Sequence, residues 1–197
     1  MTSSTQHTTA LLDTVLDDLG TVVATIGPGQ LHNPTPCTEM DVAQLRQHVL
    51  AWLSNFADGF AHPDNRAQAA PADPGASVDH VTAVRAASDQ LVASLQAGAA
   101  EQPLYLGDDA MPGEMALGMI LWEYLVHGWD LARATGQPWA PPEAAAAQIV
   151  AFAPSMLSPD YQGEGKMFAD PVPVPPSAPA MDQLLGLSGR DPRWSPA

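Results

Sequence analysis

Apolar residues recur every three or four positions along most of this chain, which is the spacing of one buried face of an α-helix. The pattern predicts four long helices, over residues 8–26, from about 38 through 56, over 77–96 and over 113–136. Two shorter helices are predicted over 143–153 and 181–187, with a proline-rich, extended stretch between them. Valine, isoleucine and leucine do not alternate with polar residues, so the pattern predicts little strand.

These elements predict an all-α fold with a single domain over residues 1–197. We expect residues 1–136 to form a four-helix core, and residues 137–197 to form a Pro-rich C-terminal extension with a short terminal helix. The leucines of that terminal helix would be exposed if it stood alone. The extension should therefore pack on the bundle.

Turn-forming and capping residues set the expected ends of these elements. Prolines and glycines predict loops at 62–76 and around 103–109. Thr38, followed three residues later by Asp41, approximates a capping box and predicts that the second helix starts near residue 38. Gly136 follows the fourth helix, as expected for a C-terminal cap.

The predicted helix over 113–136 is apolar on nearly every side, as is typical of a helix buried inside a protein. Glu123, His127 and Asp130 interrupt it at i, i+4 and i+7, so they lie on one narrow stripe. A buried, unpaired carboxylate is costly, so it must be protonated, paired or bound to a metal. A Glu and a His one turn apart can hold one metal ion between them.

A third candidate ligand lies on the second helix, where His48 stands beside Leu45 and Trp52 on the core face. Taken alone, this position fits a hydrogen-bonded core histidine better than a ligand. Together, His48, Glu123 and His127 form a His₂Glu set, which is a common catalytic zinc set with an open fourth position. The spacing alone leaves both a metal site and a plain ion pair open.

Two further residues carry groups that could be reactive. Asp130 is the candidate catalytic residue, because it could orient a metal ligand or act as a base. Its alternative role is a structural pair with Arg133 or with a backbone donor. Cys37 is the only cysteine, which excludes an intrachain disulfide and a Cys-based zinc site. We expect Cys37 to be a buried structural thiol.

The charge balance limits the expected partners. The chain has 22 acidic residues against 7 Lys plus Arg, a formal net charge of −15. Without a basic stripe, neither nucleic acid nor an anionic membrane surface is expected as a partner. The N-terminus lacks the charged and apolar regions of a signal peptide, and no uninterrupted apolar run reaches about 18 residues. We therefore expect a cytoplasmic monomer or homodimer that acts on a small molecule.

The segment Glu-Tyr-Leu-Val-His-Gly-Trp-Asp-Leu-Ala-Arg-Ala-Thr-Gly, which begins at Glu123, resembles the DinB-like, mycothiol-dependent maleylpyruvate isomerase N-terminal superfamily. The segment 34–37, the pair Asp41-Val42 and His48 match the first ligand region of that family. The C-terminal part is similar to an actinobacterial metal-binding branch at residues 172–175, 182–185 and 189–192. The resemblance covers nearly the whole chain.

This resemblance implies a four-helix bundle that carries one divalent metal on a His, Glu, His set. The metal is usually zinc, although nickel or another divalent ion also suits such ligands. The family's ligands map onto His48, Glu123 and His127. The resemblance also implies mycothiol as a cosubstrate, whose thiol would be deprotonated at the open position of the metal. The resulting thiolate is the nucleophilic form of sulfur.

We therefore expect a metal-dependent enzyme, with zinc as the expected ion. It would use a low-molecular-weight thiol such as mycothiol for S-transfer to, or isomerisation of, a small electrophile. One alternative is a thiol-independent tailoring enzyme of secondary metabolism, a cyclase or hydrolase in which the metal is a Lewis acid. Another is a metal-binding protein without turnover. A wide, polar pocket mouth would favour the thiol, and a closed apolar pocket would favour a hydrophobic substrate.

Overall fold

The computed structural model describes residues 4–75, 78–157, 162–163 and 169–196. Within these residues the chain forms six α-helices and one small sheet of three strands. The helices are α1 (Ser4–Thr25), α2 (Val42–Ala61), α3 (His80–Gln96), α4 (Gly113–Thr135), α5 (Glu143–Phe152) and α6 (Ala180–Leu187). The strands are β1 (Arg66–Ala67), β2 (Leu104–Leu106) and β3 (Asp109–Met111).

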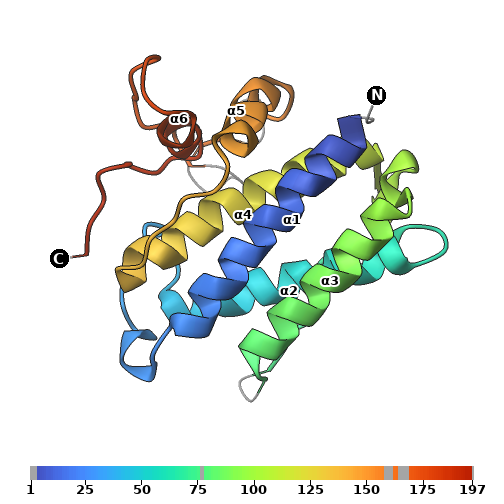
Figure 1. The fold of residues 1–197 in the computed structure, drawn as a ribbon, viewed down its shortest axis with the longest axis horizontal. Coiled ribbons are helices and arrows are strands. Elements are labelled where there is room, and N and C mark those ends of the chain that lie inside the picture. The colour runs from blue at the N-terminus through green and yellow to red at the C-terminus, as the bar shows by residue number, and fades with distance from the viewer. Residues whose placement is uncertain (1–3, 76–77, 158–161, 164–168, 197) are drawn as a thin grey trace.

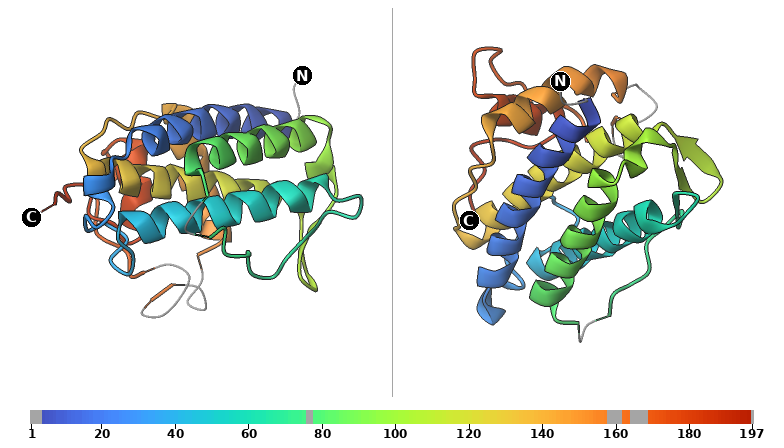
Figure 2. Two further views of the ribbon diagram at one scale, coloured as in Figure 1. Left: turned by 90° about the horizontal axis from the view of Figure 1, so that it is seen from below. Right: turned by 45° about the vertical axis from the view of Figure 1, so that its right-hand side comes forward.

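The helices α1 to α4 form a bundle of two layers, with α1 beside α3 in one layer and α2 beside α4 in the other (Figures 1 and 2). Each of the four helices contributes fully buried leucines to the core, among them Leu12, Leu53, Leu91 and Leu125. Full burial of such a side chain contributes about 1.5–3 kcal/mol. Of the four neighbouring pairs of helices, α2 and α4 pack least extensively, and polar side chains meet between them.

The C-terminal extension packs on the bundle, as its leucines predict. Helices α5 and α6 contact each other, and Figure 1 shows both lying over α4. Leu184 and Leu185 of α6 are fully buried. Next to them, the indole Nε1 of Trp122 in α4 donates a hydrogen bond of 2.8 Å to Oγ of Ser188. The extension is thus fixed to the helix that carries the predicted ligands.

The prediction of an all-α fold is wrong at one end of the bundle, where both predicted loops contribute strands. The strands β2 and β3 form an antiparallel hairpin, and β1 joins β2 in parallel. The hairpin turns at Gly107, whose φ of 64° lies in the left-handed region that glycine adopts without steric cost. A Gly-Asp pair between two short apolar runs is a hairpin signal. The strands are only two or three residues long, too short to show an alternating pattern.

The predicted start of the second helix at Thr38 is also wrong. Thr35 Oγ1 donates to the backbone oxygens of Cys37 and Met40, at 2.9 and 2.8 Å, so a closed turn occupies the residues before the helix. The N-terminal cap is Asp41, whose Oδ1 accepts from the backbone nitrogen of Gln44 at 2.9 Å. The side chain of Gln44 accepts from the backbone nitrogen of Asp41 in return, which completes a capping box.

The other helix ends lie close to their predicted positions. Helix α1 begins four residues before the predicted residue 8, at Ser4. Helix α3 is capped by Asp79, and its predicted start at residue 77 lies outside the described residues. Gly136 adopts the left-handed conformation predicted for the cap of α4, with φ of 69°. In the described part of the chain, none of the helices combines the length and apolar character that crossing a membrane requires.

Replacing Asp41 by alanine should lower the free energy of unfolding by about 1 kcal/mol, because α2 loses its capping side chain. Thr38→Ala is the matched control, since Thr38 is exposed and lies outside the helix. Urea unfolding of the two variants and the wild type measures both differences. Equal losses in the two variants would contradict the assignment of the cap.

Candidate metal centre

Three side chains converge between α2 and α4, from the two helices that the sequence analysis singled out. Nε2 of His48 lies 3.1 Å from Oε1 of Glu123, and Nε2 of His127 lies 3.4 Å from the same oxygen. The imidazole rings of His48 and His127 are packed edge to face, with their centroids 5.1 Å apart. His48, Glu123 and His127 therefore form a candidate metal-binding group, with one ligand atom from each residue within 4.8 Å of the others.

The spacing of these atoms fits a small divalent ion. In a tetrahedral site with metal–ligand distances of about 2.0–2.1 Å, neighbouring ligand atoms lie roughly 3.3 Å apart. The two distances from Glu123 Oε1 to the histidine nitrogens, 3.1 and 3.4 Å, bracket that value. The side chains of His48 and Glu123 remain 31% and 29% exposed, so the group is accessible from one side. A fourth ligand could approach from there.

A second layer of contacts fixes the ring of His127. Its Nδ1 lies 3.0 Å from Oδ2 of Asp130, which is completely buried. A carboxylate accepts, so Nδ1 carries the hydrogen and Nε2 is left to face Glu123 and His48. Asp130 thus orients the ring of the candidate ligand His127. The structure gives Asp130 this contact, and its catalytic role stays a prediction.

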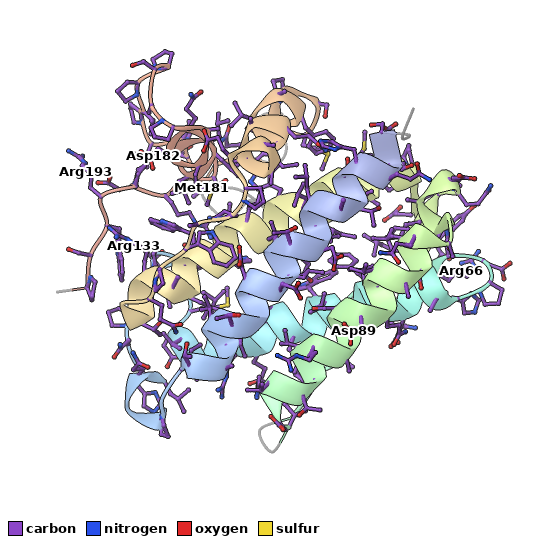
Figure 3. All side chains as sticks on the ribbon, in the orientation of Figure 1. Arg66, Asp89, Arg133, Met181, Asp182 and Arg193 are labelled. Atoms are coloured by element: carbon purple, nitrogen blue, oxygen red, sulfur yellow. The ribbon has the colours of Figure 1, made fainter. Side chains whose placement is uncertain are left out.

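The predicted alternative partner of Asp130, Arg133, does not contact it. Arg133 points towards the C-terminal segment (Figure 3), donates to the backbone oxygen of Trp194 at 2.8 Å and lies over the ring of Trp129. The partner of Asp130 is Arg190, whose NH2 group donates to Oδ2 at 3.1 Å. Arg190 was not among the residues that the sequence pattern singled out. The only signal for it was its place in the Gly-Arg-Asp-Pro segment that resembles the family.

Opposing charges set the protonation of the group. Burial raises the pKa of Glu123, but the charge of His127 and the hydrogen bond from His48 outweigh burial and lower that pKa to about 2. Burial lowers the pKa of His127, but the carboxylates of Glu123 and Asp130 outweigh burial, and the pKa is raised. Glu123 is therefore an ionised carboxylate at neutral pH, which is the form that binds a metal.

Cys37 lies next to the candidate centre, which the sequence did not predict. A second set of possible ligand atoms, from Cys37, His127 and Asp130, also lies within 4.8 Å. However, Asp130 already forms a salt bridge with the guanidinium of Arg190. A metal cation bound to this second set would therefore be repelled by the positive charge of Arg190. Burial raises the pKa of the Cys37 thiol. The nearby charge of Arg190 lowers that pKa, but by less, so the pKa is raised overall. The first set is the better metal site, because among the described residues Glu123 pairs only with the two histidines and not with an arginine.

A surface hollow of about 440 Å³ lies one helical turn along α2 from His48. Its lining is mixed, with Thr35, Thr38, Glu39, Asp41 and Gln44 as polar members and with Pro34, Met40 and Trp194 as apolar members. Hydroxyl, amide and carboxylate groups at its wall can hydrogen-bond a polar ligand. The hollow is therefore suited to a molecule rich in hydrogen-bonding groups.

Known proteins resemble this chain over most of its length. Residues 12–132 match the family described as Mycothiol maleylpyruvate isomerase N-terminal domain, and that match includes all three candidate ligands. The chain is also 32% identical, over 174 residues, to two uncharacterized proteins of Mycobacterium tuberculosis, from strains CDC 1551 / Oshkosh and H37Rv. The alignment covers 88% of this chain and 92% of each relative. No solved structure gives a significant match.

Protein purified without chelators should carry about one divalent ion per chain, and His48→Ala, His127→Ala and Glu123→Gln should each lose most of it. Glu123→Gln is the most specific change, because it keeps the shape of the side chain and removes its charge. Glu114→Gln, an exposed change on the same helix, is the control and should keep wild-type content. Elemental analysis measures the ion, and full metal content in Glu123→Gln would contradict the assignment.

In metal-free protein, the Glu123–His127 pair should stabilise the fold most between about pH 4.5 and pH 6.5. The lowered pKa of Glu123 contributes stability above its unfolded value, which is lost as the pH falls towards 2. The raised pKa of His127 contributes stability below its unfolded value, which is lost as the pH rises through the folded value. Urea unfolding with chelator present should show the largest difference between wild type and Glu123→Gln in that window. A difference independent of pH would count against the pair.

Proposed function

This chain belongs to the mycothiol maleylpyruvate isomerase N-terminal domain family, and we propose that it is a divalent-metal-dependent enzyme that uses a low-molecular-weight thiol such as mycothiol. The proposed ion is zinc, held by His48, Glu123 and His127. The proposed reaction is S-transfer to a small electrophile, or its isomerisation through a transient thiol adduct.

The observation that supports the proposal most is the convergence of three ligand atoms at a point that is open on one side. The spacing of these atoms suits a tetrahedral ion, and the exposure of His48 and Glu123 leaves room for a fourth ligand. Structural zinc sites use four protein ligands and are closed, whereas catalytic sites keep a position open. A group with three ligands and one accessible side favours catalysis over mere metal storage.

The side chains around the centre have distinct roles in this proposal. A bound zinc ion would supply a Lewis acid that takes up a thiol and keeps it as the thiolate. Asp130 holds the ring of His127 so that its Nε2 faces Glu123, and the single charge of Glu123 would leave a bound divalent ion with net positive charge. Cys37 is held as a protonated thiol by its raised pKa, so the nucleophilic sulfur comes from the cosubstrate.

The hollow beside α2 supports a polar cosubstrate. Mycothiol carries sugar hydroxyl groups, which donate readily to carboxylates and amide oxygens. Glu39, Asp41 and Gln44 present such acceptors at the wall of the hollow, and Gln44 lies one turn of α2 before His48. In the proposal, the thiol end of the molecule lies at the metal and its polyol end lies in this hollow.

Protein loaded with Co²⁺ in place of zinc should gain a sulfur-to-metal charge-transfer band in the near ultraviolet when reduced mycothiol is added. S-methylated mycothiol is the matched control, because it has the same sugars and no thiol proton to lose. Glu39→Gln should weaken mycothiol binding without abolishing the band at saturation. A cobalt protein that shows no band with mycothiol would overturn the thiol proposal and favour a thiol-independent Lewis-acid reaction.

A further inference from the structure

The end of α6 forms a motif that directs Arg190 towards α4. Gly189 follows the helix cap Ser188 in the left-handed conformation, with φ of 78°. The backbone nitrogen of Arg190 donates to the oxygen of Leu185 at 2.9 Å, and that of Gly189 donates to the oxygen of Gly186 at 3.1 Å. This pair of bonds is a Schellman motif, which turns the chain sharply after a helix. After this turn, the side chain of Arg190 lies largely buried against α4.

The guanidinium of Arg190 is held between two acceptors. Its NH1 group donates to the backbone oxygen of Ser188 at 2.8 Å, and its NH2 group donates to Oδ2 of Asp130 at 3.1 Å. The Arg190 side chain is only 12% exposed and that of Asp130 is fully buried. A pair of charges this far from water stays together, since either charge alone would be costly to bury.

The same oxygen of Asp130 also contacts the ligand ring. Oδ2 lies 3.1 Å from the guanidinium of Arg190 and 3.0 Å from Nδ1 of His127. The other oxygen, Oδ1, is buried without a hydrogen-bond partner among the described residues. Among the described residues, Arg190 and His127 are thus the hydrogen-bond partners that set the orientation of the carboxylate. If Arg190 is removed, the carboxylate can turn or take up a proton, and it no longer fixes the ring.

We propose that Arg190 is a positioning residue of the metal centre and that the C-terminal extension thereby forms part of the site. Arg190 holds Asp130, Asp130 holds Nδ1 of His127, and Nε2 is left in place towards Glu123 and His48. This inference rests on the metal site of the proposed function, but not on the thiol or on any reaction. The contact between Arg190 and Asp130 and occupation of the metal site are then coupled, and each favours the other.

The test measures metal affinity in the full chain, by competition with a chromophoric chelator. Arg190→Met should weaken zinc binding about tenfold, as is usual when a group that orients a metal ligand is lost. Arg190→Lys, which keeps a donor and the charge, should recover part of the loss. Asp130→Asn should weaken binding as well, and Arg190→Met should add little further loss in that background, because both act through His127.

Two matched variants separate positioning from general stability. Ser188→Ala removes the bond from Trp122 that anchors α6, and should lower the melting temperature of the chelated protein while zinc affinity stays within about twofold of wild type. Arg193→Gln removes an exposed arginine that pairs only with Asp191 among the described residues, and should change neither quantity.

Co²⁺ absorption adds a readout of ligand geometry. The visible d–d bands of the Arg190→Met protein should shift and weaken relative to wild type, and those of Ser188→Ala should not. Wild-type affinity and spectrum in a less stable Arg190→Met protein would overturn the inference and leave the proposed function standing. Failure of the wild type to bind zinc or cobalt would overturn both. If Arg190→Met does not fold, Asp130→Asn takes its place, and wild-type zinc affinity in Asp130→Asn would contradict the inference, because Arg190 acts on His127 through Asp130.

Discussion

The interior of this bundle depends on the mutual neutralisation of a few charges. A carboxylate inside an apolar protein must be paired, because desolvation otherwise forces it to take up a proton. Here the charges form one continuous chain from Arg190 through Asp130 and His127 to Glu123 and His48. With neutral histidines, one arginine and two carboxylates sum to −1. In the proposed function a divalent ion makes that sum +1, and a bound thiolate then brings it to zero.

The surrounding fold serves this chain of charges. Helix α4 is buried on nearly all sides, so His127 and Asp130 are shielded from competing water, whereas Glu123 stays partly exposed. Helix α2 packs loosely enough against α4 to admit His48 and Glu123 between them. The extension closes the other side through α6, whose buried leucines hold Arg190 against Asp130. One side remains open at the ligands, which is where a fourth ligand and a substrate could enter.

The sequence predicted the helices and the ligand set because both leave local periodic signals. The spacing of Glu123 and His127 is fixed by the helix itself, and His48 was recognisable as a polar residue on an apolar face. The short strands were not predicted, since two or three residues show no period. The start of α2 was misplaced because the turn that Thr35 closes depends on backbone acceptors that no sequence pattern shows. Arg190 was missed because its partner lies 60 residues away, on another helix.

The one-turn spacing of Glu123 and His127 has a consequence for how the protein reaches its native state. Both residues belong to a single helical segment, so in the proposed function a metal ion could bind the pair as soon as that turn forms, before α2 supplies His48. An ion bound in this way would stabilise nascent helix in the unfolded chain. The unfolded ensemble would then also gain from the metal, and the added stability of the native protein would fall short of what its full affinity implies. The higher metal affinity of the native state over the unfolded state would then come mainly from His48, the candidate ligand on α2 that reaches the other two only when the bundle folds.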